Sequence, residues 1–166
     1  TEIRFHQDFA YEAHTNDDML AVLLFVDDVT PENGPLEVVP GTHRGAIFDH
    51  WQDGIFTGTI AEGDLAGLGD SVDCYGPAGT ACLMHTRLVH GSGPNLTEVS
   101  RTLSIFSYRS EDSRILHPNH LPSANEGELV RGVATGRIRC VEYEMPIAEV
   151  PETASFFDQQ ARGVPT

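Results

Sequence analysis

The chain has 166 residues, of which 40% are hydrophobic and 21% are charged, and this composition is typical of one folded domain with a real core. The formal net charge of -15 excludes a surface built for nucleic acid or an anionic membrane, because the negative field would repel both. No apolar run approaches the roughly 20 residues of a bilayer-spanning helix.

The cysteines and the start of the chain bear on where the protein works. The cysteines number three, and their spacing matches neither a CxxC motif nor a zinc site. We therefore expect reduced, mostly buried thiols and a cytoplasmic protein. The sequence begins with Thr1 in place of a methionine, and we expect a fragment that lacks its N-terminal portion.

Short apolar segments alternate with turns rich in glycine and proline over the first two thirds of the chain. Segment 19–26 is a continuous apolar run, which predicts a strand buried on both faces. Segment 101–108 alternates polar and apolar residues, which predicts a half-buried antiparallel strand. The strands predicted in this part of the chain are 3–9, 19–26, 36–39, 71–75, 80–84 and 101–108.

The remaining segments carry weaker patterns. We expect a short helix or loop at 62–69, one or two helical turns at 126–133, a strand at 138–143 and a helix at 151–162, which has a proline near its start. The sequence shows no repeat and no internal linker, so residues 1–166 are expected to form a single domain. Many short strands with frequent turns favour a β-sandwich or a β-barrel.

The first predicted strand carries a histidine and a carboxylate two residues apart, His6 and Asp8. Residues i and i+2 of a strand point to the same face, so this spacing predicts two metal ligands side by side. A facial iron site needs two histidines and one carboxylate with open positions opposite them. The same spacing also suits an exposed strand face without a metal.

His90, which follows the strand predicted at 80–84, is the candidate for the third ligand. Eleven residues later Arg101 opens the next strand. If the two strands pair across the loop between them, His90 and Arg101 lie near each other, and the guanidinium can bind a carboxylate in a bidentate manner. Ser92 offers a hydroxyl to the same anion.

These motifs, together with the segment 33–44, resemble the phytanoyl-CoA dioxygenase family of non-haem iron(II), 2-oxoglutarate-dependent oxygenases. The resemblance covers roughly residues 3–109, in the family's order. It implies a mainly β fold, a double-stranded β-helix (jelly-roll, cupin-like) core with short peripheral helices. It also implies an enzyme that hydroxylates an aliphatic C–H bond of a small molecule with dioxygen and releases succinate and carbon dioxide.

Carried over by position, the resemblance makes His6, Asp8 and His90 the iron ligands and the catalytic centre. It makes Arg101 the partner of the distal carboxylate of 2-oxoglutarate, assisted by Ser92. The presence of Asp8 favours hydroxylation, because related halogenases lack this carboxylate. Gly34, Pro40 and Gly41 match turns of the family.

The sequence departs from the family in two respects. We expect the N-terminal portion of the family to be missing here, and the substrate side differs. An aromatic residue often stands where this chain has Glu12. We expect Tyr11, Glu12 and His14 to face the substrate; a solvated loop is the alternative reading. Two other functions stay open: a jelly-roll module that binds a small ligand without catalysis, and a cupin-type metal enzyme that does not use 2-oxoglutarate.

Overall fold

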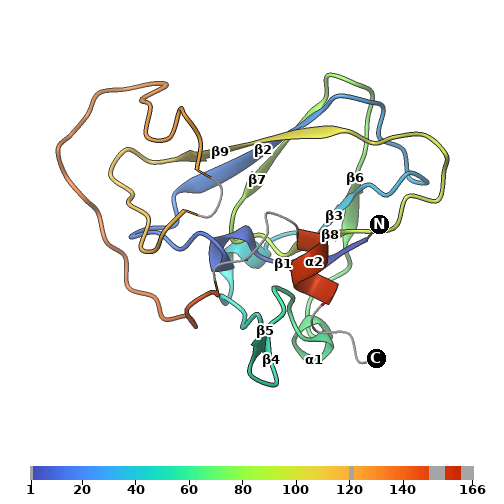
Figure 1. Cartoon of the computed structure of the whole chain (residues 1–166), viewed down its shortest axis with the longest axis horizontal. Coiled ribbons are helices and arrows are strands. Elements are labelled where there is room, and N and C mark those ends of the chain that lie inside the picture. Colours follow the sequence, from blue (N-terminus) through green and yellow to red (C-terminus); the bar gives the residue numbers. More distant parts are fainter. Residues whose placement is uncertain (1, 120–121, 150–155, 162–166) are drawn as a thin grey trace.

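The computed structural model of the chain describes residues 2–119, 122–149 and 156–161 and consists mainly of two facing antiparallel β-sheets (Figure 1). The four-stranded sheet has the order β1 (Ile3–His6), β8 (His90–Ser92), β3 (Leu36–Val38), β6 (Val72–Cys74). The three-stranded sheet has the order β7 (Ala81–His85), β2 (Met19–Phe25), β9 (Leu103–Arg109). The mainly β architecture of the prediction is confirmed.

The core lies between the two sheets. Leu36 of the four-stranded sheet packs with Ala21, Leu23 and Met84 of the three-stranded sheet, and all four are buried. The alternation of β2 explains this arrangement, because its odd-numbered residues are buried whereas Leu24 on the other face is 36% exposed. The prediction that this strand is buried on both faces is therefore wrong.

The first strand ends earlier than predicted. β1 stops at His6, and Asp8 opens a 3-10 turn, η1 (Asp8–Ala10). Gln7 keeps extended dihedrals of -123° and 126° between them, so the strand geometry continues for one residue beyond the last strand pairing. A second 3-10 turn, η2 (Thr42–Arg44), follows β3.

A small hairpin lies outside the predicted set. Strands β4 (Trp51–Gln52) and β5 (Ile55–Phe56) pair around Asp53 and Gly54, whose φ angles are 51° and 77°. A two-residue Asp-Gly loop is a strong signal for a hairpin turn. This signal is present in the sequence, and the prediction overlooked it. The prediction at 62–69 is met by helix α1 (Glu62–Leu65).

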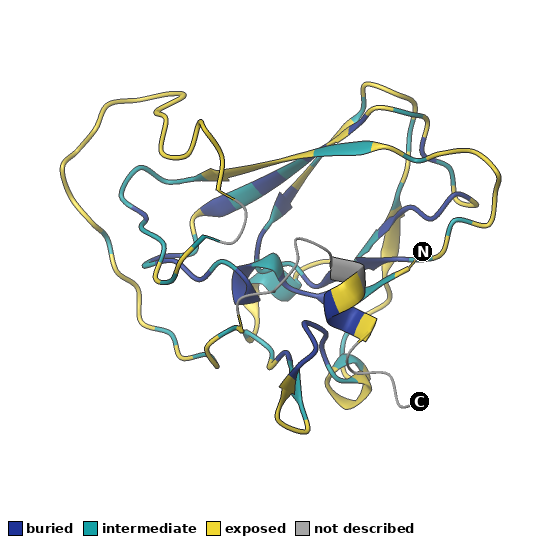
Figure 2. Cartoon of the chain, viewed as in Figure 1, coloured by how far each residue is buried: buried dark blue, intermediate teal, exposed yellow. Residues whose placement is uncertain are grey.

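The segment after Ser110 is largely irregular and exposed (Figure 2). Residues 126–133 contain turns and no helix, and 138–143 do not form a strand, so both predictions are wrong. Helix α2 (Phe156–Ala161) lies within the helix predicted at 151–162, of which 151–155 and 162 fall outside the described residues. The three cysteines are free thiols, but Cys140 is exposed, against expectation.

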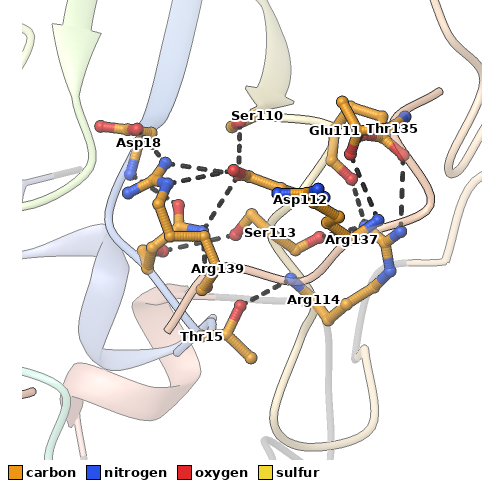
Figure 3. A network of polar contacts seen from close by, with 11 residues as sticks. Thr15, Asp18, Ser110, Glu111, Asp112, Ser113, Arg114, Thr135, Arg137 and Arg139 are labelled. Carbon is orange, nitrogen blue, oxygen red and sulfur yellow. Dashed lines mark hydrogen bonds and ion pairs between the residues drawn. The ribbon is translucent and has the colours of Figure 1, made fainter. Parts of the chain in front are cut away.

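A polar network ties this irregular segment to the loop that follows η1 (Figure 3). The Arg139 guanidinium bonds to the carboxylates of Asp112 and Asp18. Asn16, whose side chain is fully buried, donates to the Arg139 carbonyl oxygen at 3.0 Å. The network holds Asp112 and Arg139 against residues 15–18.

None of the described helices is long and apolar enough to cross a membrane.

Candidate metal centre

Strand pairing brings the three predicted ligands together. His6 of β1 and His90 of β8 are directly opposite each other in the antiparallel ladder, and their ring centroids are 4.2 Å apart. Asp8 Oδ1 lies 3.5 Å from His6 Nε2 and 3.4 Å from His90 Nε2. Their candidate donor atoms all lie within 4.8 Å of one another, and both histidines are buried.

Backbone carbonyls orient both imidazoles. Nδ1 of His6 is 2.9 Å from the Arg4 carbonyl oxygen, and Nδ1 of His90 is 2.9 Å from the Leu88 carbonyl oxygen. Since a carbonyl only accepts, each Nδ1 carries the hydrogen and donates it. The Nε2 lone pair of each neutral ring is then available beside Asp8, which is how metal-bound histidines are held.

The electrostatics of the three groups favour a cation at their centre. Burial raises the pKa of Asp8, but the adjacent imidazoles, His90 ahead of His6, outweigh it and hold that pKa well below its usual range. Burial and the neighbouring His90 lower the pKa of His6. Burial alone would lower the pKa of His90, yet the adjacent Asp8 carboxylate raises it. Two imidazole nitrogens and one carboxylate, gathered in a partly closed site, suit a ferrous ion with open positions.

Gln7 and His50 support the centre from behind, and the sequence reasoning missed both roles. The Gln7 side chain is fully buried, donates to the Ala46 and Arg87 carbonyl oxygens, and accepts from the Phe48 amide. Its backbone N–H donates to His50 Nε2 at 3.0 Å. A signal existed, because a residue between two ligands on an extended segment must point to the side opposite the ligands.

The predicted substrate residues follow η1 in the sequence, and their side chains differ in their hydrogen-bond partners. Tyr11 is buried, and its hydroxyl donates to the Gly58 carbonyl oxygen at 2.8 Å. His14 is buried, and its Nε2 accepts a hydrogen bond from Arg109 at 2.9 Å. Burial and the nearby Asp8 raise the pKa of Glu12 to about 8.

The route by which Arg101 was expected to reach the centre is wrong, since β8 and β9 do not pair and belong to different sheets. His90 is the first residue of β8, a strand outside the predicted set. The four-stranded sheet nevertheless directs Ser92 inward, because it is directly opposite the buried Leu36. Leu103, two residues after Arg101, packs on the same core, and Arg101 itself is partly buried.

The turns matched to Gly34 and Gly41 have the geometry that glycine permits. Both have positive φ angles, of 79° and 86°. A Cβ added to Gly34 would lie 2.7 Å from the Gly93 carbonyl oxygen, so this glycine lets the turn before β3 contact the loop after β8.

Comparison with known protein families gives one family over most of the chain. A family model described as phytanoyl-CoA dioxygenase (PhyH) matches residues 1–103. A probable alpha-ketoglutarate-dependent hypophosphite dioxygenase from Stutzerimonas stutzeri is 33% identical over 140 residues, which cover 81% of this chain and 48% of that protein. An L-proline trans-4-hydroxylase from Streptomyces griseoviridis is 33% identical over 140 residues, which cover 71% of this chain and 52% of that protein.

Solved structures show the same architecture. The crystal structure of EctD from S. alaskensis with 2-oxoglutarate and 5-hydroxyectoine matches with a TM-score of 0.59 at 26% identity, covering 83% of this chain and 50% of that one. A crystal structure of EctD with bound Fe gives a TM-score of 0.59 at 28% identity over 70% and 42% of the two chains. The core is the predicted double-stranded β-helix, and the chain spans about half the length of the curated relatives it matches.

Proposed function

Because the chain belongs to the phytanoyl-CoA dioxygenase family, we propose that it is an iron(II)- and 2-oxoglutarate-dependent dioxygenase that hydroxylates an aliphatic C–H bond of a small molecule and releases succinate and carbon dioxide. The observation that carries the proposal is the meeting of His6, Asp8 and His90 on paired strands, with both Nε2 atoms facing one carboxylate. That donor set is the one expected for a non-haem ferrous site.

The residues of the centre have separate tasks in this proposal. His6, Asp8 and His90 hold the ion on one side and leave its other side for ligands. Bound iron(II) supplies the redox chemistry that couples dioxygen and the oxidative decarboxylation of 2-oxoglutarate to oxidation of the substrate. The buried Gln7 and His50 fix the backbone between the ligands, so the site is formed before the cosubstrate arrives.

Arg101 and Ser92 form the anchor for 2-oxoglutarate. The guanidinium of Arg101 is partly buried, and burial lowers its pKa. Within the described residues it makes no ion pair, so a carboxylate bound beside it would offset the cost of burying its charge. β8 runs from His90 to Ser92, so Ser92 and Arg101 would hold the end of a dicarboxylic acid that is remote from the ion.

Tyr11, Glu12 and His14 border the substrate side. The side chains of Tyr11 and His14 are engaged with the Gly58 carbonyl and with Arg109, so they shape this side from within the fold. Glu12 lies four residues after Asp8, and its carboxyl group makes no hydrogen bond with the described residues. We assign Glu12 the direct contact with the substrate.

The free cysteines suit a reducing compartment, which favours a cytoplasmic enzyme. We propose that residues 1–166 belong to one domain.

Succinate release tests the proposal. The protein is incubated without air with iron(II) and then with dioxygen, ascorbate, 2-oxoglutarate and a panel of amino acids, ectoine, phosphonates and hypophosphite. We expect succinate formation to require iron(II) and its rate to increase when one compound of the panel is present. Iron-loaded, folded protein that forms no succinate above the buffer blank with any compound would overturn the proposal and favour a binding module.

A further inference from the structure

We propose that Gln160 of α2 is a positioning residue for the metal ligand His6, acting through the backbone of Arg4. The inference deepens the proposed function and rests on it, since it takes His6 to be a ligand. Figure 1 shows α2, at the far end of the sequence, against β1, and the contacts identify what this helix contributes there.

One carbonyl group links the two side chains. The Arg4 carbonyl oxygen accepts a hydrogen bond from His6 Nδ1 at 2.9 Å and another from Gln160 Nε2 at 3.3 Å. A carbonyl has two lone pairs, so it can accept both. The Arg4 backbone N–H donates to Gln160 Oε1 at 2.8 Å, and the amide of Gln160 therefore holds this residue on both sides.

Gln160 takes the place of a neighbouring strand. β1 is the last strand of its sheet, with β8 on one side and no further strand of the described residues on the other. An edge strand presents unpaired backbone groups, and a side-chain amide offers the same donor and acceptor as a peptide group. Gln160 is only 5% exposed, so these hydrogen bonds are shielded from water. The Arg4 guanidinium also bonds to the Gln160 carbonyl oxygen, which fixes α2 at this point.

The consequence concerns the orientation of the His6 ring. The hydrogen bond from Nδ1 decides which nitrogen carries the hydrogen and directs Nε2 toward Asp8. If the Arg4 carbonyl turns away, His6 loses the partner that keeps Nε2 unprotonated. Removing such an outer partner of a metal-bound histidine typically costs 10- to 100-fold in metal affinity.

The sharpest variant is Gln160→Glu, with Gln159→Glu as its matched control. Glutamate at 160 keeps an oxygen for the Arg4 N–H but replaces the Nε2 donor with an oxygen that faces the Arg4 carbonyl. Gln159 lies in the same turn of α2, is 3% exposed, and donates instead to the Phe56 carbonyl oxygen. The same change there perturbs the helix equally without touching the backbone that holds His6.

The first measurement reads His6 in metal-free protein labelled with ¹⁵N-histidine, at pH 8, where ordinary histidines are neutral. We expect His6 to be hydrogenated at Nδ1 in the wild type and in Q159E, and to be a mixture of the two neutral forms in Q160E. The second measurement is an anaerobic titration with Co(II), in which Q160E should bind about tenfold more weakly and Q159E as the wild type does.

The outcomes separate the two proposals. A wild-type mixture of neutral forms, or a Q160E variant that matches Q159E in both measurements, would overturn the role of Gln160. A wild type that releases no succinate would remove the proposed enzyme, while the metal-free spectra would still decide what Gln160 does. If Q160E does not fold, Gln160→Asn, which withdraws the same amide by one methylene, is compared with Gln159→Asn in the same way.

Discussion

His6 and His90 are cross-strand neighbours, directly opposite each other where β1 pairs with β8, with their ring centroids 4.2 Å apart. The distance between two ligands that are remote in sequence is thus set by the spacing of one antiparallel ladder. Metal binding should therefore respond both to loss of a ligand and to any change that moves β1 relative to β8.

The first prediction concerns the ligands. Asp8→Ala and His6→Ala should each abolish iron(II) binding and succinate formation, because either change leaves two donors in a site that needs three. Anaerobic iron titration and the succinate assay measure the two effects. Asp73→Ala, which removes an exposed carboxylate from β6, is the control. Full activity in either ligand variant would contradict the assignment.

The second prediction concerns the cosubstrate anchor. Arg101→Ala should raise the concentration of 2-oxoglutarate needed for half-maximal rate by the equivalent of about 2–5 kcal/mol, as expected for the loss of a partly buried charge partner. Iron binding should stay unchanged. The exposed Arg44 provides the control, since Arg44→Ala removes a similar charge from η2. An unchanged 2-oxoglutarate requirement in Arg101→Ala would place the anchor elsewhere.

The third prediction tests the contact between the two ligand strands. A Cβ added at Gly91 would lie 2.8 Å from the Ile3 carbonyl oxygen, so Gly91→Ala should push β1 away from β8 and weaken metal binding at least tenfold. Gly93→Ala places its Cβ 3.2 Å from the flexible Glu37 carboxylate and should be tolerated. Equal metal affinity in the two variants would show that strand spacing does not set the site.

The fourth prediction concerns the polar network beyond Ser110. Asn16→Ala should lower the free energy of unfolding by about 1–3 kcal/mol, because it removes a fully buried side chain that donates to the Arg139 carbonyl oxygen. The Arg139 side chain is 40% exposed, so water screens its ion pairs, and Arg139→Gln should destabilise the fold less than Asn16→Ala does. Urea unfolding of the two variants gives the comparison, and the reverse order would show that the ion pairs hold this segment.

The fifth prediction is a pH dependence of stability from His50. Burial, followed by the charge of His6, lowers the pKa of His50 to about 4, and its Nε2 already accepts the Gln7 N–H. Because protonation is disfavoured in the folded state, this contribution is complete above pH 6.5. It is lost as the pH falls toward 4, by on the order of 3 kcal/mol in all. The unfolding free energy of His50→Gln should fall less steeply than that of the wild type between pH 7 and 5; parallel curves would contradict the prediction.

The sequence predicted β2, β9 and the side-by-side placing of His6 and Asp8 because these features depend on local patterns. The alternation of residues 103–109 and the apolar run at 19–25 encode strands directly, and the spacing of His6 and Asp8 is a property of one extended segment. The Asp53-Gly54 hairpin was equally local, and its turn signal was overlooked.

The remaining features of the site depend on contacts between distant segments. The pairing of β8 with β1 and β3, in place of β9, follows from the closure of two sheets and has no local signature. Gln7, His50 and Gln160 act through hydrogen bonds to residues remote in sequence, and no spacing rule identifies such partners. The absence of a strand at 138–143 has a similar cause, since this stretch is held by the Arg139 network and not by a sheet.

The junction of β1 and β8 also has a consequence for the unfolded protein. An ion held at once by residues 6, 8 and 90 is a reversible cross-link that closes a long loop of the chain. The unfolded chain would have to close this loop to bring the three residues together, so the ion binds the folded state in preference to the unfolded one. Loading the ion should therefore raise the melting temperature in proportion to the logarithm of the free ion concentration. A chelator that removes the ion should lower the melting temperature again.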